Sequence, residues 1–301
     1  MFPASREDGV PELLGAIEAG GTKFVLAVGT GHKDITAQTV IPTTTPDETL
    51  ATALDWFKEQ GHLAALGISC FGPVELDRKS SKWGYITQTT KSGWSDTDVA
   101  GHLGQALDCP VGFDTDVNGA VLGEFTHGAA RDCHVAIYVT VGTGIGGGAI
   151  VNGAPLHGFR HPEMGHVRPR RHADDILFDG ICSFHDDCLE GLASGPAIMK
   201  RWGSSLSELP NDHPAHEIIA DYLGQLCATL LALYSPQRII LGGGVMHTPV
   251  LLDRIRAKTG QLSKAYFAYD AESTICAPEL GALSGITGAF ELARKVIHVK
   301  K

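Results

Sequence analysis

One pattern constrains the fold of this 301-residue chain more than any other, because it occurs in both halves. It consists of an apolar strand candidate, a glycine-rich turn and a second strand candidate. In the first half, Leu13–Glu18 and Phe24–Val28 flank the turn Gly20–Thr22. In the second half, Val135–Val141 precedes the glycine run 142–148, and a strand resumes at Ala149–Val151. The repeat suggests a duplication, and a chain of this length is expected to form two domains.

Further helix and strand candidates lie between and after these two units. Helices are predicted at Pro46–Gln60, with Thr45 as N-cap, at Asp116 to about Phe125, at Ala215–Tyr234 and near Ala282–Val296. Short strands are predicted at Leu63–Ser69, Val111–Asp114 and Arg238–Leu241. The stretch 152–190 has no clear periodicity and is rich in His, Gly, Asp and Cys, which indicates an irregular insertion.

Composition excludes several classes of function. The formal charge is −10 and the 24 basic residues form no dense run, so a nucleic-acid interface is not expected. A nucleotide remains possible, because backbone N–H groups and a metal ion can bind phosphate locally. The chain starts without a basic segment and apolar run, and no apolar stretch is expected to reach the roughly 20 residues that span a bilayer. Seven cysteines, an odd number, fit a reducing compartment, so a cytoplasmic protein without membrane contact is expected.

Three glycine-rich segments are candidates for nucleotide binding, because glycine lets backbone N–H groups approach a phosphate or ribose closely. They are Gly20, Gly21, Thr22 and Lys23; Gly142, Thr143 and Gly144; and Gly242, Gly243 and Gly244. The first could equally be a tight hairpin turn, and the third could be a simple helix entry. The second contains more glycine than a turn requires, which favours a binding function.

Asp116 is the candidate general base, because phosphoryl transfer to an alcohol needs a carboxylate that orients the hydroxyl and accepts its proton. It stands where a predicted strand gives way to a helix. Asp114 is a nearby competitor for this role. The alternative is that Asp116 only caps the helix.

The sharpest local motif is Cys182-x2-His185-x2-Cys188, which puts three metal-binding side chains on one short segment. His166 is a plausible fourth ligand, and four nitrogen and sulfur ligands are typical of structural zinc. The alternatives are ordinary free thiols, or ligation by His157, His161 or His172 instead. Glu163 and Glu190 bracket this segment, and carboxylates in such positions can accept hydrogen bonds from sugar hydroxyls.

These motifs, in this order, resemble those of the ROK family of sugar kinases, and the resemblance runs from Leu14 to about Leu292. It rests on segment 18–23, on Asp114–Asn118 with Leu122–Glu124, and on segment 142–146. The stretch His161–His166, the Cys/His cluster, Cys188–Gly191 and Leu241–Gly244 complete it.

The resemblance implies an α/β, two-domain, actin-like (ribonuclease H-like) ATPase fold of the sugar kinase type, with ATP and hexose in the cleft and Mg²⁺ bridging the phosphates. The expected division is a lead-in at 1–12, a small domain at 13–125 on which a final helix at about 282–300 packs, and a larger domain at 126–281 carrying the insertion 152–190. A homodimer is a further family-level expectation.

The resemblance also assigns roles to single residues. It makes Asp116 the catalytic base and Asn118, Glu163, His166 and Glu190 contacts to the sugar. His166, Cys182, His185 and Cys188 become the ligands of a structural Zn²⁺. If one ring nitrogen of His166 binds the metal, the other can donate to a sugar oxygen.

Within the family, the residues of these motifs are similar to those of the fructokinase branch. His185 stands where many members have Cys, and Thr115 where glucose-directed members have Asn. Glu18 replaces the more usual Asp, with an effect that the sequence does not predict. The expected reaction is phosphorylation of fructose to fructose 6-phosphate by ATP. The alternatives are a mannokinase, a glucokinase or an N-acetylhexosamine kinase, or a non-catalytic sugar-binding regulator. A DNA-binding member is disfavoured, because only about a dozen residues precede the first strand.

Overall fold

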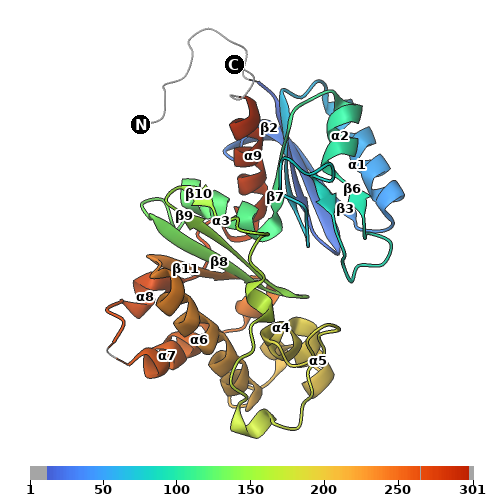
Figure 1. Ribbon diagram of the computed structural model, residues 1–301. Coiled ribbons are helices and arrows are strands. Elements are labelled where there is room, and N and C mark those ends of the chain that lie inside the picture. Colours follow the sequence, from blue (N-terminus) through green and yellow to red (C-terminus); the bar gives the residue numbers. More distant parts are fainter. Residues whose placement is uncertain (1–11, 265, 298–301) are drawn as a thin grey trace. The chain divides into compact units, whose positions relative to one another are not determined.

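The computed structural model describes residues 12–264 and 266–297, which form two compact units (Figure 1). The first unit consists of Met1–Gly123 and Gly285–Lys301, and the second of Glu124–Ser284. Most of the predicted lead-in at 1–12, and the end of the predicted final helix at 298–300, lie outside the described residues.

The first unit is built on a five-stranded sheet of order β3-β2-β1-β4-β7. The strands β1 (Leu14–Ala19), β2 (Lys23–Gly31) and β3 (Asp34–Pro42) form an antiparallel meander, and β4 (Ala65–Cys70) and β7 (Val111–Thr115) extend it in parallel with β1. The helices α1 (Pro46–Gln60) and α2 (Ala100–Leu107) lie on one face, and α9 (Ser284–Ile297) lies on the other (Figure 1). A small pair, β5 (Tyr85–Ile86) and β6 (Thr97–Asp98), completes this unit.

The second unit contains a five-stranded sheet of order β10-β9-β8-β11-β12. Its hairpin of β8 (Val135–Val141) and β9 (Ile145–Val151) is followed by the parallel strand β11 (Arg238–Gly242). The edges are β10 (Ala154–Pro155) and β12 (Ile275–Cys276). Each sheet therefore joins an antiparallel hairpin to parallel strands, as the repeated sequence pattern suggests.

The helices of the second unit follow the insertion. They are α4 (Leu189–Ala193), α5 (Gly195–Trp202), α6 (Ala215–Tyr234), α7 (Leu251–Ser263) and α8 (Ala271–Thr274). The helix α3 (Asp116–His127) crosses the boundary between the two units in the sequence. Short 3-10 turns of the second unit occur at Met164–His166, Ala173–Asp175, Leu206–Glu208, Gly244–His247 and Gly281–Leu283.

Most predicted elements are confirmed, including both glycine-turn hairpins, α1 with Thr45 as its cap, and the full length of α6. The prediction that the run 142–148 is a turn was wrong in its second part. Gly146, Gly147 and Gly148 are in β9 and pair with Thr140, Val139 and Tyr138 of β8. Gly147 is needed there because a Cβ would lie 2.5 Å from the sulfur of Met164.

Several elements had no clear sequence signal, among them β3 and α2. The edge strand β3 buries only Ile41, so it lacks the apolar pattern of a core strand. The helix α2 contains Gly101 and Gly104, which lower helix propensity, and its Val99 cap makes no side-chain hydrogen bond.

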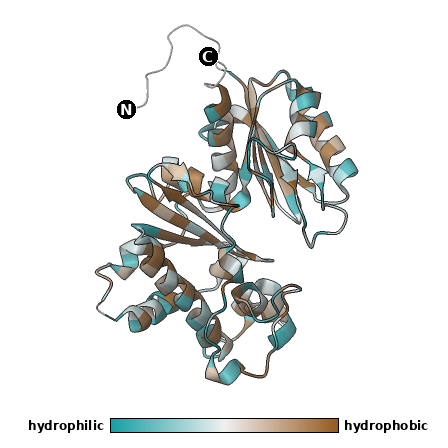
Figure 2. Ribbon diagram, viewed as in Figure 1, coloured by the Kyte–Doolittle hydropathy of each residue, from teal (hydrophilic) through white to brown (hydrophobic). Residues whose placement is uncertain are grey.

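Apolar side chains are concentrated along the strands of both sheets (Figure 2). The first sheet is buried on both faces, with Ile17, Leu26 and Ile68 toward α1 and α2, and Leu14 and Ala16 toward α9. In the second unit, the strands pack against α6, whose Leu223, Leu226 and Leu230 are buried. By length and composition α6 could span a membrane, contrary to the sequence expectation, but its apolar character is explained by its place in this core.

Two helical glycines of the second unit offer a matched pair of substitutions. In α6, a Cβ on Gly224 would lie 2.7 Å from the Cβ of Lys258, whereas a Cβ on Gly260 of α7 would meet nothing within 4 Å. We expect Gly224→Ala to destabilise the fold by about 1–3 kcal/mol through forced separation of the two helices. Gly260→Ala should stabilise it by roughly 0.5–1 kcal/mol, since alanine has the higher helix propensity. Urea unfolding of both variants checks the signs, and equal shifts would contradict the close packing.

Candidate functional site

Asp116 begins α3 directly after β7, but it is not the side chain that caps the helix. The backbone N–H of Asn118 donates to Oγ1 of Thr115 at 3.0 Å, which is N-cap geometry. The carboxylate of Asp116 accepts from the adjacent N–H of Val117, at 2.9 Å, and from its own backbone N–H. The residue as a whole is partly exposed, whereas its carboxyl group is buried. Thr115 therefore already satisfies the helix end, which weakens the alternative that Asp116 is only a cap.

Asp114, the competing candidate for the base, uses its carboxylate in hydrogen bonds within the protein. Its side chain is buried, and its Oδ1 accepts from the N–H of Thr115 at 2.8 Å and from Nδ2 of Asn118 at 2.7 Å. These bonds fix the junction from which Asp116 projects. Asn118 is likewise buried, so in this structure it supports Asp114, and its contact with a substrate stays a prediction.

Asp116 lies close to a second carboxylate, that of Glu18 at the end of β1. Burial raises the pKa of Asp116 to about 6, although the Val117 N–H opposes the shift. Burial also raises the pKa of Glu18 to about 7; the charge of Asp116 adds to this effect, while Lys23 and the N–H of Ile286 oppose it. Burial is thus the largest cause of the raised pKa of both groups. A raised pKa brings a carboxylate closer to the range in which it can accept a proton near neutrality.

The first glycine turn begins two residues after Glu18 and is held by hydrogen bonds, one of them from Thr43. Gly20 donates to the carbonyl of Lys23 at 2.9 Å, and Oγ1 of Thr43 donates to the carbonyl of Gly20 at 2.7 Å. Gly21 and Thr22 are exposed, and a Cβ on Gly21 would meet nothing within 4 Å. The turn thus presents backbone to solvent on a fixed frame. Thr43 was missed by the sequence interpretation, since nothing in the sequence marks this threonine, which follows β3, as a partner of the turn.

In the second unit, two glycine segments lie side by side at the carboxyl ends of two neighbouring strands. β8 and β11 are adjacent and parallel, so the chain leaves both at the same edge, at Gly142 and at Gly243. A Cβ on Gly142 would be 4.0 Å from the backbone nitrogen of Gly244. Gly243 has a φ of 92°, which favours glycine, and Thr143 and Gly244 are exposed. The carboxyl ends of neighbouring parallel strands are a common position for phosphate and nucleotide binding.

The four predicted metal ligands come together in the same unit. One ligand atom each of His166, Cys182, His185 and Cys188 lie within 4.8 Å of one another. Nδ1 of His166 is 3.3 Å from Nδ1 of His185 and 3.4 Å from Sγ of Cys188. Sγ of Cys182 is 3.8 Å from Nδ1 of His166 and 3.7 Å from Nδ1 of His185. Tetrahedral zinc with ordinary Zn–N and Zn–S bonds spaces its ligands by about 3.3–3.8 Å, so the cluster fits that geometry.

The two ring nitrogens of His166 have different neighbours. While Nδ1 points into the Cys/His cluster, Nε2 is 4.0 Å from Oε2 of Glu163. Glu163 also lies 3.5 Å from Nδ1 of His161 through its other oxygen, and its side chain is 46% exposed. Glu163 and the second nitrogen of His166 are therefore neighbours, as a shared substrate contact would require.

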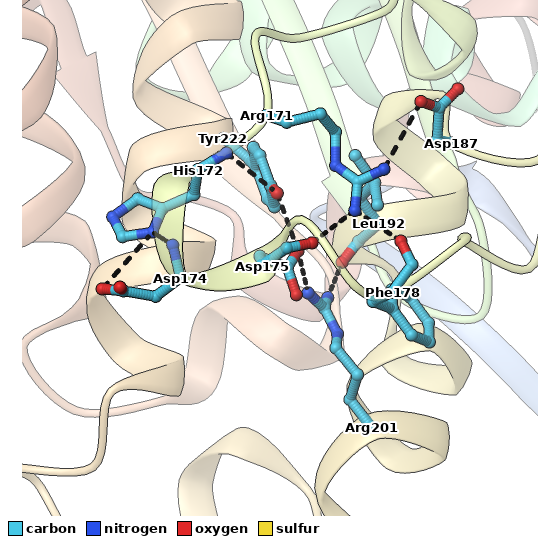
Figure 3. Close-up of polar contacts among 9 residues, drawn as sticks. All are labelled: Arg171, His172, Asp174, Asp175, Phe178, Asp187, Leu192, Arg201 and Tyr222. Atoms are coloured by element: carbon cyan, nitrogen blue, oxygen red, sulfur yellow. Dashed lines mark hydrogen bonds and ion pairs between the residues drawn. The ribbon is translucent and has the colours of Figure 1, made fainter.

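A buried polar network that the sequence interpretation missed holds the insertion in place (Figure 3). Oδ2 of Asp175 accepts from Nη1 of Arg201 and from the hydroxyl of Tyr222, the latter at 2.7 Å. Nη2 of Arg171 donates to the carbonyls of Asp175 and Phe178. Burial lowers the pKa of the Arg201 guanidinium, and Asp175 opposes that shift. These residues have no sequence signal, because charged side chains are usually found on the surface.

The predicted site residues therefore form two sets, each within one unit. The first unit holds Asp116, Asn118 and the turn Gly20–Lys23. The second holds both remaining glycine segments, the Cys/His cluster, and Glu163 and Glu190. These features define an α/β protein with exposed glycine turns at the ends of sheet strands, a buried carboxylate and a cluster of four side chains that could hold a metal ion.

Comparison with known proteins gives the family. The model of the ROK family matches residues 14–296, and the chain belongs to this family. A fructokinase of Zymomonas mobilis subsp. mobilis is 49% identical over 290 residues, which cover 94% of this chain and 96% of the relative. A fructokinase of Pediococcus pentosaceus is 42% identical, with 95% and 99% covered.

The fold is shared with solved members of the family. The crystal structure of a ROK hexokinase from Thermus thermophilus superposes with a TM-score of 0.74 at 26% identity, over 95% of this chain and 99% of that one. The predicted actin-like α/β fold is thereby confirmed.

The network around Asp175 generates a stability prediction. Asp175→Ala leaves Arg201 buried without its carboxylate partner, which should cost about 3–5 kcal/mol. Asp174→Ala is the matched control, because the neighbouring side chain is 79% exposed and should change stability by less than about 1 kcal/mol. Urea unfolding measures both. Equal small effects would show that the network does not support the fold.

Proposed function

We propose that this protein is an ATP-dependent sugar kinase that phosphorylates a hexose, with D-fructose as the preferred substrate and fructose 6-phosphate as the product. The observation that carries the proposal is the environment of Asp116, a desolvated carboxylate on a fixed strand–helix junction beside an exposed glycine turn. We assign fructose rather than another hexose because the relatives at 42% and 49% identity are named fructokinases.

In this mechanism Asp116 accepts the proton of the attacking sugar hydroxyl. The base must be ionised, so activity should rise as pH rises through about 6 and Asp116 loses its proton. Burial also raises the pKa of Glu18, to about 7, and its backbone bond from Ile286 holds this carboxyl against α9. Orientation of the hydroxyl contributes most of the rate enhancement, since phosphoryl transfer needs little covalent chemistry from the protein.

ATP would be held by backbone N–H groups of the glycine segments. Each of these segments has an exposed residue: Gly21 in the first unit, and Thr143 and Gly244 in the second. Lys23 adds a positive charge beside the first turn. Bound Mg²⁺ would supply neutralisation of the phosphate charge.

The Cys/His cluster would hold a structural Zn²⁺ through His166, Cys182, His185 and Cys188. Two thiolates and two imidazoles form a closed ligand set that leaves no open position for catalysis. The support for zinc is the spacing of the ligand atoms, all within 4.8 Å of one another. The metal would also fix the ring of His166, so that Nε2 and the carboxylate of Glu163 face the sugar together.

Two alternative functions use the same residues and can be distinguished by experiment. A mannose, glucose or N-acetylhexosamine kinase would use the same base and glycine segments with another pocket. A sugar-binding regulator would bind the hexose without turnover. We also propose a cytoplasmic location and a homodimer, for which exposed apolar side chains on the insertion offer a surface: Phe159, Ile176, Leu177 and Phe184.

The substrate assignment predicts a ranking of hexoses. ADP release with Mg-ATP should give the highest kcat/KM for fructose in a panel with mannose, glucose and N-acetylmannosamine, and little release without sugar. A higher value for another hexose would move the substrate and keep the kinase. Hexose binding without any sugar-dependent ADP release would instead support a regulator.

The zinc assignment predicts metal content and stability. The purified protein should contain about one zinc ion per chain, and Cys182→Ala should lose it, melt at a lower temperature and bind fructose more weakly. Cys133→Ser, which changes a cysteine outside the cluster, is the control and should retain the metal. An unchanged melting curve after loss of zinc would contradict a structural role.

A further inference from the structure

Glu190 makes a contact that the sugar-binding assignment does not explain. It lies on α4, and its Oε2 accepts a hydrogen bond from the backbone N–H of Ile145 at 2.9 Å. Ile145 is the residue that follows Gly144 and begins β9. The carboxylate is therefore bonded to the glycine segment that we assign to ATP, within the same unit.

The same stretch of chain holds this segment at a second point. The N–H of Gly195, just after α4, donates to the carbonyl of Gly142 at 2.8 Å. Gly142 in turn donates to the carbonyl of Gly144 at 2.9 Å. The segment 142–145 is thus closed on itself and fixed at both ends to residues 190–195. Its conformation depends on where α4 and the side chain of Glu190 lie.

The contact also explains why glycine is needed at position 144. A Cβ there would be 2.6 Å from Oε2 of Glu190 and 3.5 Å from its Cδ, with no other atom within 4 Å. The neighbouring Gly142 is different, because a Cβ there would meet only the nitrogen of Gly244 at 4.0 Å. Neither glycine has a positive φ, so alanine can adopt both backbone conformations.

We propose that Glu190 is a positioning residue for the nucleotide segment as well as a sugar contact, so that hexose and nucleotide binding strengthen each other through the Glu190–Ile145 hydrogen bond. This inference rests on the proposed function. A carboxylate has about four acceptor positions, so one oxygen can accept from Ile145 while the group also accepts from a sugar hydroxyl. Sugar bound to Glu190 restricts that side chain and thereby orders segment 142–145 for the phosphates. By linkage, bound nucleotide must tighten sugar binding by the same factor.

The test measures the Kd of fructose by calorimetry, with and without Mg²⁺ and the non-hydrolysable analogue AMP-PNP. For the wild type we expect the analogue to tighten fructose binding by about fivefold or more, which is the usual range of coupling between two sites. Gly144→Ala should displace the carboxylate of Glu190 rather than the backbone, because the new methyl group meets only that flexible side chain. The variant should bind fructose more weakly and show little or no tightening.

Gly142→Ala is the matched control, since it adds the same methyl group to the same segment away from Glu190. It should weaken binding of the analogue and leave fructose affinity in its absence unchanged. Melting curves of both variants establish that they are folded. Equal tightening in the wild type and Gly144→Ala, or a fructose-binding wild type without tightening, would overturn the coupling. A wild type that neither binds nor phosphorylates any hexose would overturn the proposed function itself.

Discussion

The close packing of α9 on the first sheet is the constraint on which the geometry around Asp116 depends. The face of the sheet beneath this helix carries two glycines, Gly67 and Gly112, where the helix backbone comes closest. A Cβ at Gly67 would collide with the carbonyl of Ala289, and one at Gly112 with that of Leu292. The helix therefore touches β4 and β7 through its backbone. Its first turn reaches the end of β1, where the N–H of Ile286 bonds to the carboxylate of Glu18.

This packing has an electrostatic consequence at the strand ends. The helix lies against Glu18, and burial is the largest cause of the raised pKa of both Glu18 and Asp116. Two neighbouring carboxylates in such surroundings do not ionise at the same pH. The bond from Ile286 and the charge of Lys23 only partly offset the cost for Glu18. The arrangement raises the pKa of Asp116 toward the range in which a proton acceptor is useful.

Much of the fold, and the grouping of the candidate metal ligands, could be predicted from sequence, because local signals were strong where they agreed with the tertiary structure. Thr45 and Pro46 marked the start of α1, and the spacing of Cys182, His185 and Cys188 marked the metal cluster. The contacts that position these groups could not be predicted. Gly67 against α9 and Asp175 against Arg201 join residues far apart in the chain, and their residue types are ordinary for strands and surfaces. The β9 boundary was misplaced because glycine usually marks turns, whereas here it makes room for Met164.

The central claim is that Asp116 accepts the proton of the sugar hydroxyl, and the substitution Asp116→Asn tests it most directly. Fructose affinity by calorimetry and ADP release should be measured on the variant and the wild type at several pH values. The account predicts that the variant binds fructose normally but turns over slower by a factor of about 10² or more, the usual contribution of a general base. Wild-type turnover should fall as pH drops below about 6. A variant with unchanged turnover, or a wild-type profile that is flat through this range, would contradict it.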